Sequence, residues 1–340
     1  MGTSGSVSVA PEAIAAEAGL RHVDAASLTI QRRRRGRGFT YVGSRGGRVD
    51  GAKRRWIEVL ALPPAWSDVR ISADPDCHLL ATGIDDAGRR QYRYHPGFRQ
   101  VADDVKFARI AELGARIGDV RAAVAQAIAS DDERLQLTGI VVRLIDRTLM
   151  RVGSERYADE HETYGASTLR CDHVTRSGDT LQLCFTGKSG QEQTMSVTDR
   201  DVLAFVDRRR RCASGADPLF VSATGQSVDG DDVKALLCAA ARIEASAKDL
   251  RTWGASATMV AALCSPTGEP ASDPVLAAYD RVAEVLGNTR TVARESYVAP
   301  AIEAAHADGS LGSLWTSSRS SAQRSRAEST LDKLLGSRLS

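Results

Sequence analysis

The apolar positions of the chain change their spacing near residue 96. Before that point they fall in short segments, which are separated by Asp, Pro and Gly residues typical of turns. We expect strands over residues 39–42, 69–72, 79–82 and 90–94, and one short helix over residues 53–61. The pattern predicts a small antiparallel β-rich domain over residues 38–98.

Helical spacing dominates the segment that follows. Apolar residues recur every three or four positions over residues 103–114, 116–129, 140–152, 199–210, 230–245, 250–263, 274–286 and 291–298. Residues 168–197 interrupt these helices with strand spacing and two turns, which indicates a β-meander with Lys188 at a hairpin tip. Residues 99–308 are therefore predicted to form a larger, mainly α-helical domain.

The two ends of the chain lack such patterns. Residues 1–37 include a Gly/Ser-rich start and an arginine run, and are predicted to be a flexible basic extension. Residues 309–340 are rich in Ser and Arg and are predicted to be a tail, with a short helix near residues 328–335. The predicted fold class is α+β, with a β-rich N-terminal domain and a helical domain that contains the meander.

The positions of the charges say more than their sum. The net charge is only +2, but four arginines run together at residues 32–35, and a second run lies at residues 208–211. Clustered positive charge on a nearly neutral chain predicts a basic face that binds phosphates. A disordered, solvated arm is the alternative for the first run, and the two interpretations are compatible.

Several classes of protein are disfavoured by what the sequence lacks. The six cysteines are scattered, without the spacing of a metal-ligand or redox pair. The first twenty residues do not have the pattern of a signal peptide, and no run is apolar enough to span a membrane. No phosphate loop, dinucleotide fingerprint or zinc pattern is present. We therefore expect free, mostly buried thiols, a cytoplasmic location, no membrane partner, and neither a metal nor a cofactor.

A series of short motifs, in a fixed order, resembles one known family. The motifs are LPPAW at 62–66, TGID at 82–85, GRRQYRYH at 88–95, LMRVG at 149–153, YG at 164–165, TL at 168–169, GKSG at 187–190, KDLRTWG at 248–254, LGNT at 286–289 and SYV at 296–298. Together they resemble the type IB DNA topoisomerases, in particular their bacterial and poxvirus-like branch. The resemblance runs from about residue 39 to about residue 305, which is most of the chain.

The resemblance implies catalytic roles for five residues. Tyr297 is the implied nucleophile, which attacks a DNA phosphodiester and forms a 3′-phosphotyrosyl link. Arg151 and Arg251 are the implied ligands of that phosphate, because guanidinium groups donate paired hydrogen bonds and stay charged. Lys188 is the implied general acid, which protonates the leaving 5′ oxygen. Asn288 stands where many members have histidine, and its amide can donate a hydrogen bond to the phosphate but cannot titrate.

Taken singly, each of these five residues also has an ordinary structural explanation. Tyr297 is then a half-buried tyrosine at a helix end, and Arg151 and Arg251 are exposed helical arginines. Lys188 is a solvated turn lysine, and Asn288 caps a helix. The motifs taken together are what favours the catalytic interpretation.

The resemblance further implies DNA contacts outside the catalytic group. The residues that match are Gln91, Tyr92 and Tyr94, with additional phosphate contacts from Arg89, Arg90 and Lys248. Alternate residues of a strand face the same way, so Tyr92 and Tyr94 are expected to share one surface. An ordinary pair of aromatic strand residues is the alternative. The two domains are expected to form a clamp around the duplex.

The activity implied is the relaxation of supercoiled DNA without ATP or metal, because the phosphotyrosyl bond conserves the energy of the phosphodiester. We expect double-stranded DNA as the partner, a nucleoid-associated location, and a monomer, since one active site per clamp suffices. A tyrosine recombinase uses the same chemistry, but such enzymes usually have His-x-x-Arg where this chain has Lys248 and Arg251. A non-enzymatic, architectural DNA-binding protein is the second alternative, and it would leave the matching motifs unexplained.

Overall fold

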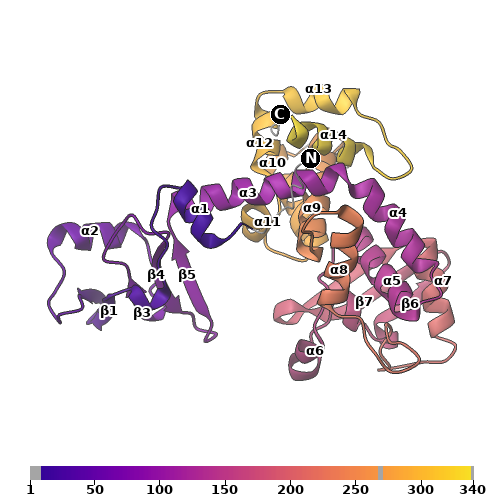
Figure 1. Cartoon of the computed structure of the whole chain (residues 1–340), viewed down its shortest axis with the longest axis horizontal. Coiled ribbons are helices and arrows are strands. Elements are labelled where there is room, and N and C mark those ends of the chain that lie inside the picture. The colour runs from indigo at the N-terminus through magenta and orange to yellow at the C-terminus, as the bar shows by residue number, and fades with distance from the viewer. Residues whose placement is uncertain (1–8, 267–270, 338–340) are drawn as a thin grey trace, which may run out of the picture. The chain divides into compact units, whose positions relative to one another are not determined.

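A computed structural model describes residues 9–266 and 271–337 of the chain. The chain divides into an N-terminal unit that ends at Lys106 and a C-terminal unit that begins at Phe107. Helix α3 (Pro96–Ala115) contains this boundary (Figure 1). Each unit has its own hydrophobic core, and the expected α+β class is confirmed.

The N-terminal unit contains one antiparallel sheet in the order β2-β1-β3-β4-β5. Its strands are β1 (Ile30–Arg35), β2 (Gly38–Val42), β3 (Ser67–Ile71), β4 (Leu79–Ile84) and β5 (Arg90–Tyr94). Helix α1 (Pro11–Glu17) precedes the sheet, and α2 (Gly51–Val59) follows β2. Ile57 of α2 is buried against Ile71 and Ala81 of the sheet, so α2 covers one of its faces. Strand β5 is an edge strand, hydrogen-bonded only to β4 among the described strands.

The expectation of a flexible extension over residues 1–37 is wrong for part of that segment. Residues 30–35, which include the arginine run, form strand β1 in the interior of the sheet. Ile30 is buried, and Arg32 donates hydrogen bonds to the carbonyl oxygens of Pro63 (2.9 Å) and Trp66 (2.6 Å). Backbone pairing on both sides orders a segment whose charge had suggested disorder. Residues 1–8 lie outside the described residues.

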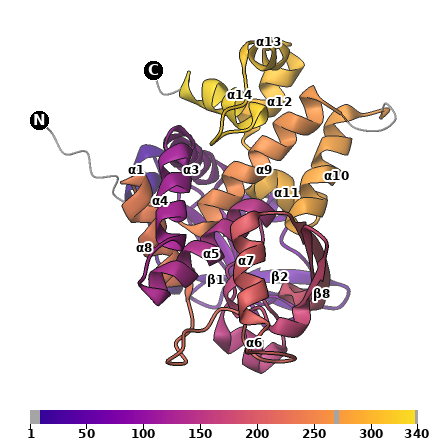
Figure 2. The ribbon, with the colours of Figure 1, turned by 90° about the vertical axis from the view of Figure 1, so that its right-hand side faces the viewer.

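The C-terminal unit is mainly helical and surrounds helix α9. Its helices are α4 (Ile117–Ile128), α5 (Glu133–Thr148), α6 (Glu155–His161), α7 (Arg200–Arg209), α8 (Gly230–Ala241), α9 (Ala247–Cys264), α10 (Pro274–Leu286), α11 (Arg290–Ser296), α12 (Pro300–Ala307), α13 (Ser310–Ser317) and α14 (Arg326–Gly336). Helix α9 packs against α5, α10 and α14, with Trp253 and Met259 fully buried (Figure 2). The predicted meander is present as β6 (Val174–Ser177), β7 (Thr180–Gly187) and β8 (Gln191–Val197).

Helix α5 ends four residues before its predicted end. Leu149 adopts a left-handed conformation (φ 55°), and its amide closes the helix on the carbonyl oxygen of Ile145 at 2.8 Å. Its side chain fills the space beside Gly254, where a Cβ atom would lie 2.3 Å from a Leu149 methyl carbon. Arg151 therefore lies after the end of the helix and not within it.

The predicted Ser/Arg-rich tail over residues 309–340 is also different in the structure. Helices α13 and α14 pack with α12 beside α9, and Leu331 is fully buried (Figure 2). Glu328 of α14 accepts hydrogen bonds from Arg121 (2.7 Å) and from the indole nitrogen of Trp253 (3.1 Å). The short helix predicted near residues 328–335 is thus present as α14, and its three buried leucines join it to the core instead of leaving it in a free tail.

Two further expectations concern membranes and thiols. No helix in the described part of the chain has the length and hydropathy needed to cross a bilayer. The six cysteines are free, as expected, but only Cys77 and Cys171 are buried, while Cys184 and Cys212 are exposed. The expectation of mostly buried thiols is therefore wrong.

The buried ion pairs of Arg121 yield a prediction about stability. Burial would raise the pKa of Glu328, but hydrogen bonds from Arg121 and its charge outweigh burial and hold that pKa below its usual range. The carboxylate therefore stabilises the fold above about pH 4.3, and this contribution is lost as pH falls through the lowered pKa. Glu328→Gln should lower the free energy of unfolding at pH 7 by about 1–3 kcal/mol.

Denaturant unfolding at pH 7 and at pH 3 measures this difference, which should shrink at the lower pH. Glu160→Gln is a matched control, because Glu160 pairs with Arg156 at the surface. Such a pair contributes about 0–1 kcal/mol. An equal loss in the two variants would contradict the role of Glu328 in the core.

Candidate active site

Five segments of the C-terminal unit bring the predicted catalytic residues together. Arg151 follows α5, Lys188 lies in the turn between β7 and β8, Arg251 lies in α9, Asn288 lies between α10 and α11, and Tyr297 ends α11. Two of them, Arg151 and Asn288, are hydrogen-bonded although they lie 137 residues apart in the sequence. The contacts below connect all five into one site.

The segment that carries Arg151 is fixed by its backbone. The amide of Ala166 donates to the carbonyl oxygen of Arg151 at 2.8 Å, so residues 164–166 run beside it. The approach requires glycine, because a Cβ atom on Gly165 would lie 2.4 Å from the backbone nitrogen of Gly153. The amide of Tyr164 donates to Thr186 of β7 at 2.8 Å, which joins the Arg151 segment to the meander.

Asn288 is aimed at Arg151 by the end of helix α10. Gly287 ends that helix in a left-handed conformation (φ 59°), and the amide of Asn288 donates back to Ala283 at 2.9 Å. The Arg151 guanidinium donates to the side-chain oxygen of Asn288 at 2.5 Å. The side-chain nitrogen of Asn288 is buried and has no hydrogen-bond acceptor among the described residues. Asn288 thus orients Arg151 and retains a donor of its own.

Arg251 is a buried cation without a carboxylate partner in the described part of the chain. The residue is only 3% exposed, and its Nε atom has no acceptor among the described residues. The guanidinium lies 5.3 Å from the ring centre of Tyr297 and 3.5 Å from the carbonyl oxygen of Leu286. Burial lowers the pKa of Arg251 to about 10, and the positive charge of Arg151 acts in the same direction. The alternative of an exposed helical arginine is therefore wrong.

Tyr297 is half-buried at the end of α11, and its backbone is held by α9. Ser256 of α9 donates a hydrogen bond to the carbonyl oxygen of Tyr297 at 3.1 Å and accepts one from the amide of Ala299 at 3.1 Å. Sequence reasoning missed Ser256, whose hydroxyl gives no pattern of its own. These bonds fix the Tyr297 backbone relative to Arg251, five residues earlier in α9.

Lys188 lies in a 3-10 turn, Lys188–Gly190, at the tip of the β7–β8 hairpin, as predicted. Its side chain is exposed. Lys188 and Arg151 line the same small cavity, together with Gln193 and Leu286. Sequence reasoning also missed Gln193, although the glycines against which it packs, Gly187 and Gly287, were within the matching motifs.

The residues expected to contact DNA outside this group are surface residues. Tyr92 is 47% exposed, and its ring stacks on that of Tyr94 with centres 6.1 Å apart, so the two do share one surface of β5. Gln91 and Arg89 both donate to Asp85, at 2.8 and 3.0 Å. Two further residues are exposed: Arg90 in the N-terminal unit and Lys248 in the first turn of α9.

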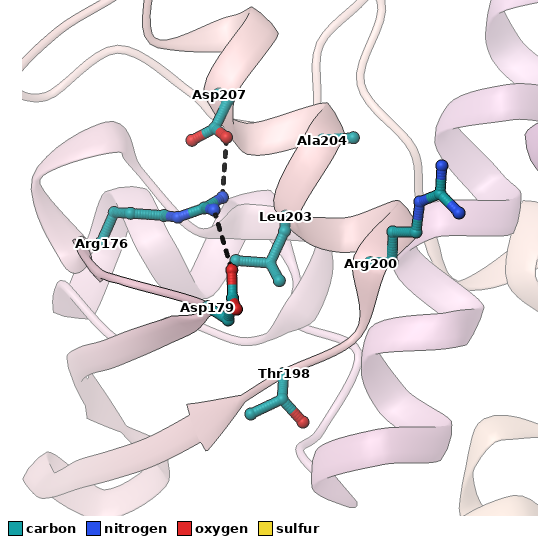
Figure 3. Close-up of a pocket in the computed structure, with 7 residues that line it drawn as sticks. All are labelled: Arg176, Asp179, Thr198, Arg200, Leu203, Ala204 and Asp207. Atoms are coloured by element: carbon teal, nitrogen blue, oxygen red, sulfur yellow. Dashed lines mark hydrogen bonds and ion pairs between the residues drawn. The ribbon is translucent and has the colours of Figure 1, made fainter.

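A more open hollow of about 450 Å³ lies elsewhere in the C-terminal unit, between the meander and α7 (Figure 3). Arg176 lies across it and is paired with Asp207 at 2.7 Å and with Asp179 at 3.9 Å. None of the predicted catalytic residues lines it. Its central arginine is thus already neutralised by carboxylates, unlike Arg251.

Two protein families match the chain. The family described as "Eukaryotic DNA topoisomerase I, catalytic core" matches residues 95–307, and "Bacterial DNA topoisomerase IB, N-terminal domain" matches residues 38–85. "DNA topoisomerase 1B" of Acanthamoeba polyphaga mimivirus is 27% identical over 260 residues, which are 71% of this chain and 76% of the relative. "DNA topoisomerase 1B" of vaccinia virus (strain Copenhagen) is 25% identical over 234 residues, 66% of this chain and 71% of the relative.

A solved structure is also similar in part. It is described as "XerH site-specific recombinase bound to difH substrate: pre-cleavage complex", with a TM-score of 0.38 and 14% identity. The match covers 54% of this chain and 48% of that one. A likeness at this level does not distinguish one class of enzyme from another.

The uncompensated burial of Arg251 leads to a prediction about the stability of the fold. A buried charge without a partner is costly, so Arg251→Met should raise the free energy of unfolding by about 1–3 kcal/mol. Arg121→Met is the matched control, because it leaves the buried carboxylates of Asp146 and Glu328 without their cation and should destabilise the fold. Calorimetric melting of both variants in phosphate-free buffer measures whether each substitution raises or lowers the free energy of unfolding. Destabilisation by Arg251→Met would contradict the assignment of Arg251 as an unpaired charge.

Proposed function

The chain belongs to the type IB DNA topoisomerase family, and on that premise we propose that Tyr297 is the nucleophile with which it cleaves and reseals one strand of DNA. The oxygen of Tyr297 attacks the phosphorus of a phosphodiester, and the bond from phosphorus to the 5′ oxygen breaks. The tyrosine proton passes to solvent, and the 5′ oxygen leaves as a hydroxyl. A 3′-phosphotyrosyl ester remains, and attack by the 5′ hydroxyl in reverse restores the strand.

The observation that carries this proposal is the buried, unpaired Arg251 beside Tyr297. Attack on phosphorus concentrates negative charge on the non-bridging oxygens. Arg251, Arg151 and the free side-chain nitrogen of Asn288 are donors that such oxygens can accept from. Donors already in place for the transition state accelerate the step more than donors that must be rearranged. A guanidinium in a buried site also interacts more strongly with a phosphate than it would in water.

Lys188 supplies the proton for the leaving 5′ oxygen in this proposal. Its ammonium group is exposed at a hairpin tip and shares a cavity with Arg151, so both can reach one phosphate. A positioned general acid contributes roughly 10²–10⁴ in rate. Because the phosphotyrosyl ester keeps the energy of the phosphodiester, we propose that the cycle needs neither ATP nor a metal.

Both units contact the DNA in this proposal. Tyr92 and Tyr94 offer one aromatic surface on β5, flanked by Gln91, Arg89 and Arg90, and Lys248 adds a cation in the C-terminal unit. Nothing in a single turnover requires a second active site, so we propose a monomer that acts on the nucleoid. Lys248 stands where tyrosine recombinases usually have histidine, which favours relaxation over recombination.

Relaxation of supercoiled plasmid in EDTA without ATP tests the proposed chemistry. The protein should relax both negative and positive supercoils, and Tyr297→Phe should lose at least about 10³-fold in rate, because phenylalanine has no hydroxyl to attack the phosphorus. The variant should still bind DNA and melt at the temperature of the unaltered protein. Relaxation by Tyr297→Phe would remove Tyr297 as the nucleophile.

The proposed phosphate contacts predict a strong dependence of DNA affinity on salt. The logarithm of the association constant should fall linearly with the logarithm of the salt concentration, by about 0.9 per phosphate contact. Arg90→Gln and Lys248→Gln should each reduce the slope by about one, since each removes one contact. Fluorescence anisotropy of a short duplex with the Tyr297→Phe protein measures the slopes. Unchanged slopes in both variants would contradict their proposed contacts.

A further inference from the structure

The side chain of Gln193, in β8, packs against two glycines that each precede a proposed active-site residue. Gly187 precedes Lys188, and a Cβ atom placed on Gly187 would lie 2.8 Å from Cγ of Gln193. Gly287 precedes Asn288, and a Cβ atom placed there would lie 2.0 Å from Oε1 of Gln193. The Gln193 side chain therefore fills the space beside both glycines. A Cβ atom at either position would collide with it.

This contact joins two segments that are otherwise separate in the sequence. Gly187 and Gln193 lie on paired strands of the β7–β8 hairpin, whereas Gly287 ends helix α10. Gln193 is half-buried and lines the small cavity that also contains Arg151 and Lys188. Its side-chain nitrogen donates to the neighbouring carbonyl oxygen of Glu192 at 3.2 Å. Its effect on the two glycines is therefore one of shape and not of hydrogen bonding.

The turn that carries Lys188 needs such a support. Ser189 (φ 66°) and Gly190 (φ 70°) both adopt left-handed conformations, and the side chains of Lys188 and Ser189 are exposed. The opposite segment is better held, since Asn288 is bonded through its backbone to Ala283 and through its side chain to Arg151. Packing of Gln193 against Gly287 connects the hairpin tip that carries Lys188 to this fixed segment.

We propose that Gln193 is a positioning residue, which holds the Lys188 turn against the Asn288 segment so that the general acid and the phosphate ligands act on the same phosphate. The proposal rests on the proposed function, in which Lys188 protonates the leaving oxygen. Loss of the Gln193 side chain lets the turn shift, and a shift of about 1 Å in a reacting group can cost on the order of 10²-fold in rate.

A change of leaving group separates this role from a general effect on folding. In a duplex whose cleavage site has first been mapped, sulfur replaces the 5′ bridging oxygen. A thiol has a pKa of about 8.5, so it leaves as a thiolate and needs no general acid. A variant in which only proton delivery is impaired should therefore recover on the sulfur duplex. A variant with a damaged phosphate site should not.

Single-turnover cleavage of the oxygen and sulfur duplexes measures the effect. Gln193→Ala should cleave the oxygen duplex about 10–100-fold more slowly and the sulfur duplex within about twofold of the unaltered protein. Gln193→Met keeps the length of the side chain and should stay within about threefold on both duplexes. Equal slowing of Gln193→Ala on both duplexes, or no slowing on either, would overturn the proposal.

Lys188→Ala on the same two duplexes distinguishes the inference from the proposed function. Recovery of Lys188→Ala on sulfur without recovery of Gln193→Ala overturns the positioning role alone. Absence of recovery in Lys188→Ala overturns the acid role of Lys188 and the inference with it.

A second pair of variants tests the packing itself. Gly187→Ala places a methyl group 2.8 Å from Gln193 and should slow cleavage of the oxygen duplex, although its backbone conformation (φ −92°) is open to alanine. In the Gln193→Ala background that collision disappears, since the next atom outside Gln193 is the carbonyl oxygen of Gln191 at 3.4 Å. The double variant should therefore be no slower than Gln193→Ala. If the rate losses of the two single variants instead multiply in the double variant, the two residues act independently.

Discussion

The cost of burying Arg251 without an opposite charge constrains much of the C-terminal unit. An isolated buried cation is expensive, and the rest of the fold must offset it. Helix α9 does so with the residues that follow Arg251: Trp253 is enclosed by α14, and Gly254 admits Leu149 closely. Arg121, on the neighbouring helix α4, shows the ordinary solution, in which two carboxylates surround the guanidinium. The contrast between these two buried arginines is what singles out Arg251 as the proposed phosphate ligand.

The candidate site is assembled from residues whose positions are fixed by neighbouring segments. Arg151, Asn288 and Tyr297 are each positioned by contacts that leave a side-chain donor or the hydroxyl available. Arg151 is oriented by Asn288, Asn288 by the end of α10, and the Tyr297 backbone by Ser256. The proposed phosphate ligands therefore need little rearrangement to bind. Lys188 differs, because it stands on a turn whose position depends on packing between hairpin and helix.

The regular elements were predictable where local pattern and tertiary environment agree. Helix α10 and strand β5 have the predicted bounds, since their spacing, caps and turn residues all indicate the same ends. The end of α5 was not predictable, because Leu149 leaves the helix for a space beside Gly254 that lies about a hundred residues away. Strand β1 was missed for a related reason, namely that its arginines hid a backbone pairing. The helix predicted near residues 328–335 is present as α14, but its packing into the core was not expected, because small polar residues surround its apolar face.

For the site, the individual residues could be found only through the motifs that surround them. A tyrosine, two arginines, a lysine and an asparagine spread over about 150 positions carry no periodic signal, and burial of Arg251 follows from the tertiary fold alone. Gln193 and Ser256 were out of reach because their contacts are made to backbone atoms of distant segments.

The hydrogen bond between Arg121 and Glu328 joins residues 207 positions apart, so it can form only after most of the C-terminal unit has been synthesised. At about 5–20 residues per second, a ribosome completes α14 roughly 10–40 s after it has made α4. Until then Arg121 has only Asp146, and the indole of Trp253 has no carboxylate to meet. The helix that presents Arg251 thus reaches its final packing late in synthesis.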